Sequence, residues 1–134
     1  MVNKEQIQDL MQGLLPAHLG ISFDEVTAER VIGHLTVASH LCTSGSILHG
    51  GTIMALADTL GAVGAFVNLP PGARTSTVES KTNFIRAARL GETVTATSRL
   101  INKGRTLMLW QTEVRNAEDK LIALVTQSQI ILAA

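Results

Sequence analysis

The spacing of apolar residues changes along the chain, and each change predicts a different element. Near the N-terminus, apolar side chains recur at helical spacing, at Ile7, Leu10, Met11 and Leu14. Asn3 is a candidate N-cap for this helix, and Pro16 is predicted to end it. The pattern indicates a surface helix that docks through one apolar stripe.

Residues 52–67 follow another pattern, because nearly every side chain is apolar or small and Asp58 carries the one charge. A helix that is apolar almost all round is a buried helix. Gly61 and Gly64 lower its intrinsic helix propensity, which suggests that they permit close packing against a sheet. Residues 68–72, with two prolines, end the helix.

The remaining segments have strand character, with period-2 alternation or β-branched residues. The predicted strands are 21–26, 30–39, 76–85, 92–101, 106–115 and 120–132. A polar loop covers 39–46, and Asn102-Lys103-Gly104-Arg105 favours a tight turn. The sequence therefore predicts a single α+β domain over residues 1–134, in which an antiparallel sheet wraps a long buried helix.

Composition narrows the class of protein. The 134 residues are 46% hydrophobic and 16% charged, and 11 basic residues balance 11 acidic ones. Disordered chains need low hydrophobicity and high net charge, and nucleic-acid binders need a broad basic surface, so both classes are disfavoured. A small domain with so few charges has little polar surface, so we expect a homo-oligomer.

Several other classes are also disfavoured. Cys42 has no cysteine to pair with, and no Cys/His cluster predicts a metal site. The N-terminus lacks a secretory signal pattern, so we expect a cytoplasmic protein. Residues 47–67 are nearly long enough to span a bilayer, but Asp58 in the middle and His49 near the start argue against a membrane span.

Asp58 is the first candidate for chemistry. Its neighbours one helical turn away are Met54, Ala55, Gly61 and Ala62, and none of them can pair with a carboxylate. Such an acid must meet a partner from another element, reach a wet cleft, or hold a raised pKa. Two roles for Asp58 remain open at this point: a functional carboxylate, or a structural one that hydrogen-bonds a neighbouring loop.

The start of the same helix is the second candidate. Gly50 and Gly51 would present backbone N–H groups at a helix N-terminus, which binds anions and would stabilise a developing oxyanion. Gly50 and Asp58 lie roughly 12 Å apart at 1.5 Å per residue. One carbonyl cannot touch both on one helix, so a site that uses both would lie between two subunits.

Residues 49–58, HGGTIMALAD, resemble the HGGxxxxxAD signature of hot-dog-fold acyl-CoA thioesterases. The resemblance is strongest to the phenylacetate-degradation (PaaI-like) and 4-hydroxybenzoyl-CoA thioesterase branch. Residues 77–88, TVESKTNFIRAA, are similar to the central strand of that family, and Leu90-Gly91-Glu92 to the turn that follows it. The order of elements agrees over nearly the whole chain.

The resemblance implies a hot-dog fold, a homodimer with joined sheets that often pairs into a homotetramer, and hydrolysis of an acyl-CoA thioester. It makes Asp58 the general base or the nucleophile, and the Gly50 N–H the group that polarises the thioester carbonyl. His49 would fix the loop geometry, and Thr77 would lie near the catalytic acid of the facing subunit. Thr43 stands where many relatives carry an Asn or Gln that orients water or the carbonyl.

The same resemblance implies no cofactor beyond the coenzyme A of the substrate. Arg86 occupies a position where a basic residue often meets the coenzyme A phosphates, although Ala87 replaces the usual proline. Arg89, Lys103 and Arg105 are weaker phosphate candidates, and the Gly51 N–H is grouped with them as a coenzyme A contact.

Rival functions remain for comparison. A non-catalytic hot-dog domain that binds acyl-CoA as a sensor or carrier is the main one, and Thr43 keeps it open. A hot-dog hydratase or dehydratase would need an Asp and His pair at a different spacing. A serine hydrolase is disfavoured because no G-x-S-x-G motif is present.

Overall fold

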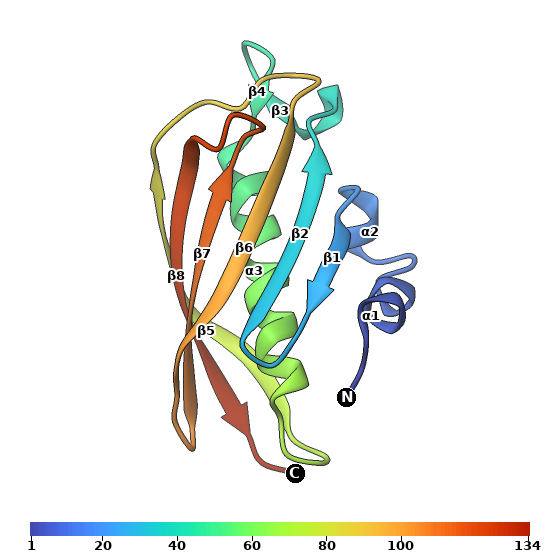
Figure 1. Ribbon diagram of the computed structural model, residues 1–134, viewed down its shortest axis with the longest axis vertical. Coiled ribbons are helices and arrows are strands. Elements are labelled where there is room, and N and C mark those ends of the chain that lie inside the picture. The colour runs from blue at the N-terminus through green and yellow to red at the C-terminus, as the bar shows by residue number, and fades with distance from the viewer.

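One long helix, α3 (Gly50–Val67), lies across one face of a six-stranded antiparallel sheet (Figure 1). A computed structural model describes all residues, 1–134. The sheet curves around the helix, and the N-terminal segment lies beside them at the β1 side of the sheet. The predicted α+β architecture is confirmed.

The sheet has the strand order β1 (Ser22–Val26), β2 (Arg30–Thr36), β6 (Thr93–Lys103), β7 (Leu107–Arg115), β8 (Leu121–Leu132) and β5 (Arg74–Phe84). Every neighbouring pair is antiparallel. The predicted strands agree with these to within three residues at each end. The predicted loop at 39–46 contains a short 3-10 helix, η1 (Ser39–Leu41), and β3 (Cys42–Thr43), which pairs with β4 (Ile47–Leu48) before α3 begins.

The N-terminal helix is shorter than predicted. Helix α1 (Lys4–Leu10) is capped by Asn3, whose side chain accepts a hydrogen bond from the Gln6 N–H at 2.9 Å. The prediction that Pro16 ends this helix is wrong, because the chain turns at Gly13, with φ +77°. Pro16 instead lies in the first turn of a second short helix, α2 (Leu15–His18), where a missing N–H costs nothing.

The predicted turn at residues 102–105 is shifted. Asn102 and Lys103 belong to β6, which carries a bulge between Leu100 and Asn102. The extra residue in the bulge extends the strand, and residues 104–106 make the turn to β7. The Gly104 N–H closes this turn on the Leu107 carbonyl at 2.8 Å.

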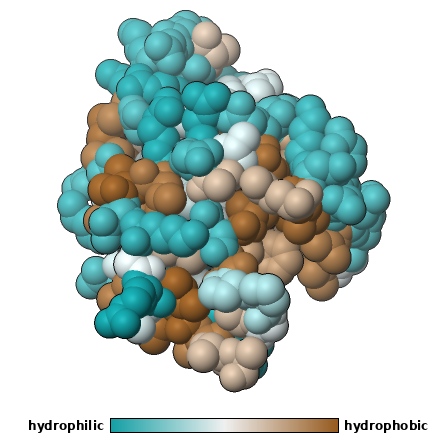
Figure 2. Space-filling view, turned by 60° about the horizontal axis from the view of Figure 1, so that its bottom comes forward, coloured by the Kyte–Doolittle hydropathy of each residue, from teal (hydrophilic) through white to brown (hydrophobic).

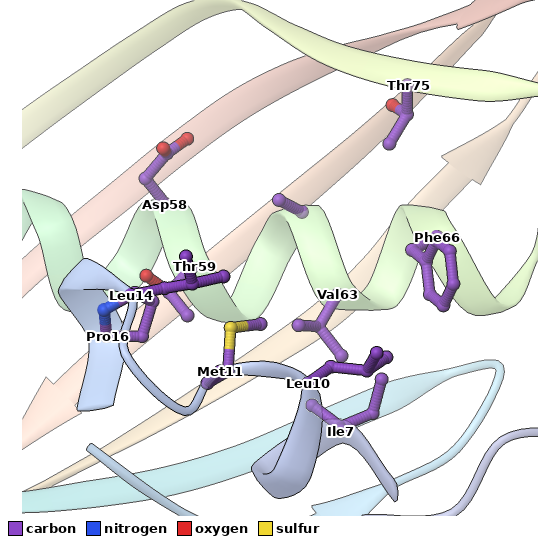
Figure 3. A pocket seen from close by; sticks show the side chains of 11 residues that line it. Ile7, Leu10, Met11, Leu14, Pro16, Asp58, Thr59, Val63, Phe66 and Thr75 are labelled. Carbon is purple, nitrogen blue, oxygen red and sulfur yellow. The ribbon is translucent and has the colours of Figure 1, made fainter.

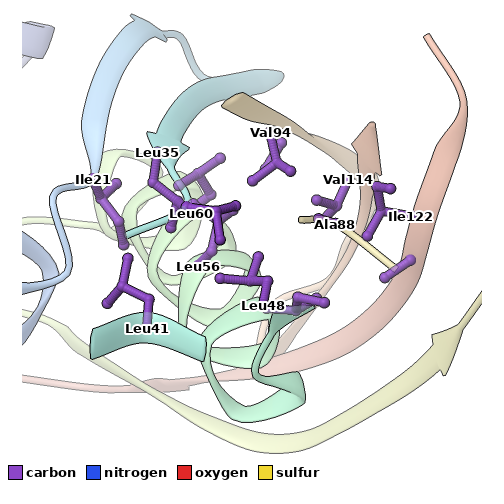
Figure 4. Packing of buried hydrophobic residues seen from close by; sticks show 14 of the residues in the cluster. Ile21, Leu35, Leu41, Leu48, Leu56, Leu60, Ala88, Val94, Val114 and Ile122 are labelled. Atoms are coloured by element: carbon purple, nitrogen blue, oxygen red, sulfur yellow. The ribbon is translucent and has the colours of Figure 1, made fainter. Parts of the chain in front are cut away.

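The main hydrophobic core lies between α3 and the sheet (Figure 4). Leu56 and Leu60 project from α3 into a layer of fully buried side chains from the strands, among them Leu35, Val94, Val114 and Ile122. Burial of each such side chain contributes roughly 1.5–3 kcal/mol relative to exposure. This layer holds α3, and with it Asp58, against the strands.

Two glycines bring α3 unusually close to the sheet. A Cβ at Gly64 would lie 2.4 Å from the ring of Trp110, and a Cβ at Gly61 would lie 2.4 Å from the side-chain amide of Gln127. Real Cβ atoms do not approach other atoms this closely, so a larger residue at either position requires the facing side chain or its strand to shift. The prediction that these glycines permit close packing is confirmed, and Trp110 is fully buried in the sheet core.

The length and apolar character of α3 would also suit a membrane span. Half of this helix is buried inside the fold, however, and its buried side packs against the sheet. A helix covered in this way is the core helix of a folded domain.

Substitution Gly64→Ala is expected to lower the stability of the fold by about 1–3 kcal/mol, the usual cost of an overpacked core. The added methyl would overlap the ring of Trp110. Thermal unfolding at a fixed protein concentration measures the effect. The double variant Gly64→Ala with Trp110→Phe is the control, because the smaller ring makes room for the methyl. An equal loss for Gly64→Ala in the Trp110→Phe background would show that the close approach is not the cause.

Candidate active site

Asp58, which has no partner on its own helix, receives two hydrogen bonds from the sheet. The Thr77 hydroxyl of β5 donates to Asp58 Oδ1 at 2.6 Å, and the Gln127 amide of β8 donates to the same oxygen at 3.3 Å. Asp58 Oδ2 accepts no hydrogen bond within the chain. The carboxylate is therefore held through one oxygen, and the other oxygen is left for a ligand or water.

Thr77 reaches Asp58 within one chain, which corrects the expectation that it approaches the acid of a facing subunit. A β-bulge between Thr77 and Glu79 interrupts the pairing of β5 with β8. Bulges bend a strand and redirect the neighbouring side chains. The Thr77 hydroxyl also lies 2.5 Å from Gln129 Oε1, so it stands between the carboxylate and a second amide.

Gln127 and Gln129 were missed as site residues by the sequence analysis. Both side chains are essentially fully buried, at 1% and 0% exposure, on the face of β8 that looks toward α3. A signal was present, because they continue the inward positions of Ala123 and Val125 in an otherwise apolar face. Two amides in such a row must find buried partners, but the strand pattern does not say which ones.

An apolar cavity of about 510 Å³ opens beside Asp58. The N-terminal segment supplies Ile7, Leu10 and Met11 from one side of α3, whereas Asp58 points to the other side, toward the strands (Figure 3). Ala62 and Phe66, further along α3, complete the apolar wall. Asp58 is the one ionisable residue that lines this cavity, so the cavity combines an apolar volume with a single carboxylate.

The N-terminus of α3 has one free amide. His49 caps the helix, since its Nδ1 accepts the Gly51 N–H at 2.7 Å and its carbonyl accepts the N–H groups of Thr52 and Ile53. The Gly50 N–H has no acceptor within the chain. The cap thus leaves free the amide that sequence analysis assigned to the thioester carbonyl, whereas the Gly51 N–H, assigned to coenzyme A, is occupied by His49.

Thr43 lies beside this helix start. Together with Gly50, Phe84 and Arg86 it lines a hollow of about 390 Å³. The Phe84 ring covers Gly50, because a Cβ there would lie 3.1 Å from a ring carbon. A side chain at residue 50 would therefore press against this ring, and glycine avoids that contact.

The four predicted coenzyme A cations fall into two groups at opposite ends of α3. Arg86 and Arg89 line a hollow near the helix start, and the Arg86 guanidinium donates to the Leu121 carbonyl at 2.9 Å. Lys103 and Arg105 lie at the other end, in a hollow beside Asn68. Since 18 residues of helix span about 27 Å, the four do not form one phosphate site within a chain. No group of three metal-ligating side chains is present.

Comparison with known proteins identifies the family. The profile described as the thioesterase superfamily matches residues 45–123, more than half of the chain and including His49, Gly50 and Asp58. The chain belongs to the thioesterase superfamily. This makes it a thioester hydrolase, confirms the resemblance drawn from HGGTIMALAD, and identifies the helix wrapped by a curved sheet as the hot-dog fold.

Individual relatives agree with this assignment. A 1,4-dihydroxy-2-naphthoyl-CoA thioesterase from Arabidopsis thaliana is 34% identical over 101 residues, covering 75% of this chain and 63% of that protein. A thioesterase from Haemophilus influenzae superposes with a TM-score of 0.93 at 26% identity, covering 98% of this chain and 92% of the other. The PaaI protein of Escherichia coli shares the fold, with a TM-score of 0.87 at 21% identity over 97% and 93% of the two chains.

Substitution His49→Ala is expected to lower stability by about 0.5–2 kcal/mol, the usual cost of a lost N-cap. The Gly51 N–H would lose its acceptor, which Nδ1 provides in the neutral imidazole. His49→Asn is the matched control, since a side-chain oxygen at an N-cap accepts the same kind of bond. Urea unfolding of the three proteins checks the prediction, and equal stability of all three would contradict the capping role.

Proposed function

We propose that the protein hydrolyses acyl-CoA thioesters, with Asp58 as the group that acts on the thioester. The observation that carries this proposal is the position of the Asp58 carboxylate, held through Oδ1 at the edge of an apolar cavity where it is the single ionisable group. An apolar cavity suits an acyl chain or an aromatic acyl group. The Arabidopsis relative, named for a naphthoyl-CoA substrate, supports the same class.

Two chemical routes suit this arrangement. As a general base, Asp58 takes a proton from water while the water oxygen bonds to the thioester carbon. As a nucleophile, Asp58 bonds to that carbon itself, and water then hydrolyses the mixed anhydride. In both routes the carbonyl oxygen gains negative charge before the carbon–sulfur bond breaks, and the coenzyme A thiolate leaves and is then protonated.

The oxyanion would meet the partner subunit's Gly50, because Gly50 and Asp58 of one helix are too far apart to share a carbonyl. In a two-fold dimer the contacts are reciprocal, so the two α3 helices run antiparallel with each Gly50 opposite the other Asp58. The two-fold axis then passes midway between these positions, at Met54. Met54 is 39% exposed in the isolated chain, as a residue at such an interface should be.

The edge strand β5 supports the same dimer. It is the last strand in the sheet order, 11 residues long, and one of its sides has no partner strand in the chain. Val78, Phe84 and Ile85 on and beside it are exposed apolar side chains. An exposed edge of this kind pairs readily with another chain, so joining two β5 strands would continue the sheet across the dimer.

The same dimer frames the proposed roles of the coenzyme A cations and of Thr43. Arg86 and Arg89, near the helix start, are proposed to bind the coenzyme A phosphates, with Lys103 and Arg105 contributing only if a second subunit brings them near. Thr43, which lines the hollow beside Gly50, is proposed to orient water or the carbonyl by one hydrogen bond. The homodimer is the minimal unit and a cytoplasmic homotetramer the proposed assembly.

Substitution Asp58→Asn is expected to reduce hydrolysis of acyl-CoA about 100- to 10,000-fold while the fold is kept. An asparagine oxygen can still accept the bonds from Thr77 and Gln127, so the packing is unchanged but the basic oxygen is lost. Release of free thiol from a panel of aryl- and fatty-acyl-CoAs measures the effect. In the same assay we expect the wild-type protein to hydrolyse apolar acyl groups faster than acetyl.

Unchanged turnover in Asp58→Asn would refute the catalytic role. Tight binding of acyl-CoA with no turnover in the wild type would instead favour the binding module. Thermal unfolding of the variant is the control for its fold.

Substitution Met54→Cys is expected to give a covalent dimer, because residue 54 faces its own copy across the proposed axis. The variant is made in a Cys42→Ser background, since Cys42 is the one native cysteine. A bismaleimide that spans about 8–10 Å, the usual separation of packed helix axes, is added and the products are separated by denaturing electrophoresis.

The control is Glu29→Cys in the same background, at the exposed turn between β1 and β2. This turn lies at the opposite side of the sheet from β5. Equal cross-linking of the two variants, or none at residue 54, would contradict the antiparallel helix pair.

A further inference from the structure

A continuous chain of hydrogen bonds runs from a backbone carbonyl to Asp58. The Thr75 hydroxyl donates to the Ile130 carbonyl at 2.9 Å, and the Gln129 amide donates to Thr75 Oγ1 at 3.1 Å. The Gln127 amide donates to Gln129 Oε1 at 2.9 Å and to Asp58 Oδ1 at 3.3 Å. The chain therefore links the interior of two strands to the carboxylate on α3.

The donor and acceptor in each of these hydrogen bonds are set by the end of the chain furthest from Asp58, the Ile130 carbonyl. A backbone carbonyl can only accept, so the Thr75 hydroxyl must donate to Ile130 and accept from Gln129. Gln129 consequently turns its nitrogen to Thr75 and its oxygen to Gln127. Gln127 must then present its NH₂ group to Gln129, and the same NH₂ group has a second proton for Asp58.

Thr77 adds a second donor at the same carboxylate oxygen. Its single proton faces two acceptors, Asp58 Oδ1 at 2.6 Å and Gln129 Oε1 at 2.5 Å. A hydrogen bond to an ionised carboxylate is the stronger of the two kinds, so the proton goes to Asp58 while that group is charged. Both donors thus converge on Oδ1.

We infer that Gln127 and Gln129 are positioning residues, which hold Asp58 through Oδ1 so that Oδ2 is the oxygen that takes the proton of water or attacks the thioester. This inference rests on the proposed function and adds to it the identity of the reactive oxygen. It also accounts for Gly61, whose missing Cβ leaves the space for the Gln127 amide. A role in packing alone would need neither the amides nor their orientation.

The electrostatic surroundings allow a clean test. No other ionisable side chain lines the cavity, and the network that reaches Asp58 from β5 and β8 consists of the uncharged Thr75, Thr77, Gln127 and Gln129. A charge introduced at one of the two amides would therefore act on Asp58 directly.

The experiment compares kcat, KM and pH profiles of Gln127→Met, Gln129→Met, their double variant and Gln127→Glu. Each methionine variant is expected to lose about 10- to 100-fold in kcat, as for a misplaced catalytic group, with KM within about twofold. The double variant should be no worse than either single one, because the two amides act as one unit. In Gln127→Glu the acidic limb of kcat should move to higher pH, since a second carboxylate beside Oδ1 disfavours the ionised form of Asp58.

The matched control is Gln111→Met on β7, whose amide bonds Thr126 at 3.3 Å outside this network and should leave kcat unchanged. Wild-type kcat in the methionine variants, additive losses in the double variant, or an unmoved acidic limb in Gln127→Glu would each overturn the inference. If the wild type hydrolyses no thioester, the proposed function fails. A carbon-13 NMR titration of the Asp58 carboxyl in wild type and Gln127→Glu then tests the contact between residue 127 and Asp58 without any need for hydrolytic activity. Identical titrations in the two proteins would refute the network.

Discussion

A carboxylate on an otherwise apolar helix is tolerable only where other elements bring it hydrogen-bond donors, and this constraint shapes the structure around Asp58. An ionised group without partners would cost several kcal/mol inside a protein. The donors come from β5 and β8, the two strands at one side of the sheet, and they reach the carboxylate because α3 lies close to that sheet. The polar inner face of these strands and the small residues on α3 are therefore parts of one arrangement.

This arrangement gives α3 three distinct sides. One side carries Leu56 and Leu60 into the main core, which fixes the helix on the sheet. A second side meets the amides and hydroxyls that hold Asp58. The third borders the cavity beneath the N-terminal segment, where apolar side chains remain partly exposed. With the lower end of the molecule turned forward, brown hydrophobic areas lie among teal hydrophilic ones on the surface (Figure 2).

The same helix also explains why one chain is insufficient for the proposed reaction. Its free amide is at the first residue, while its carboxylate is two turns further on, on a rigid rod that cannot bend to bring them together. The exposed edge of β5 and the exposed Met54 provide surfaces through which a second chain could supply the missing half. Arg86 and Lys103 belong to other elements and lie near opposite ends of this helix.

Much of this was predictable from local pattern. The strands, the buried helix, the Asn3 cap, the close packing at Gly61 and Gly64 and the isolation of Asp58 all depend on neighbours in the sequence or on the type of side chain. The HGGTIMALAD stretch was enough to indicate the thioesterase superfamily and the hot-dog fold, and so the reaction class.

Tertiary structure decided which groups meet. Gln127 and Gln129 lie 69 and 54 residues from the partners to which they donate, Asp58 and Thr75, and strand alternation shows that such amides point inward without showing what they face. The bulge beside Thr77, the cavity under the N-terminal segment and the placement of four cations at two ends of α3 likewise depend on strand register and helix position. Those are set by the packing of the whole core, because a shift of one residue in register turns every side chain of a strand to the other face.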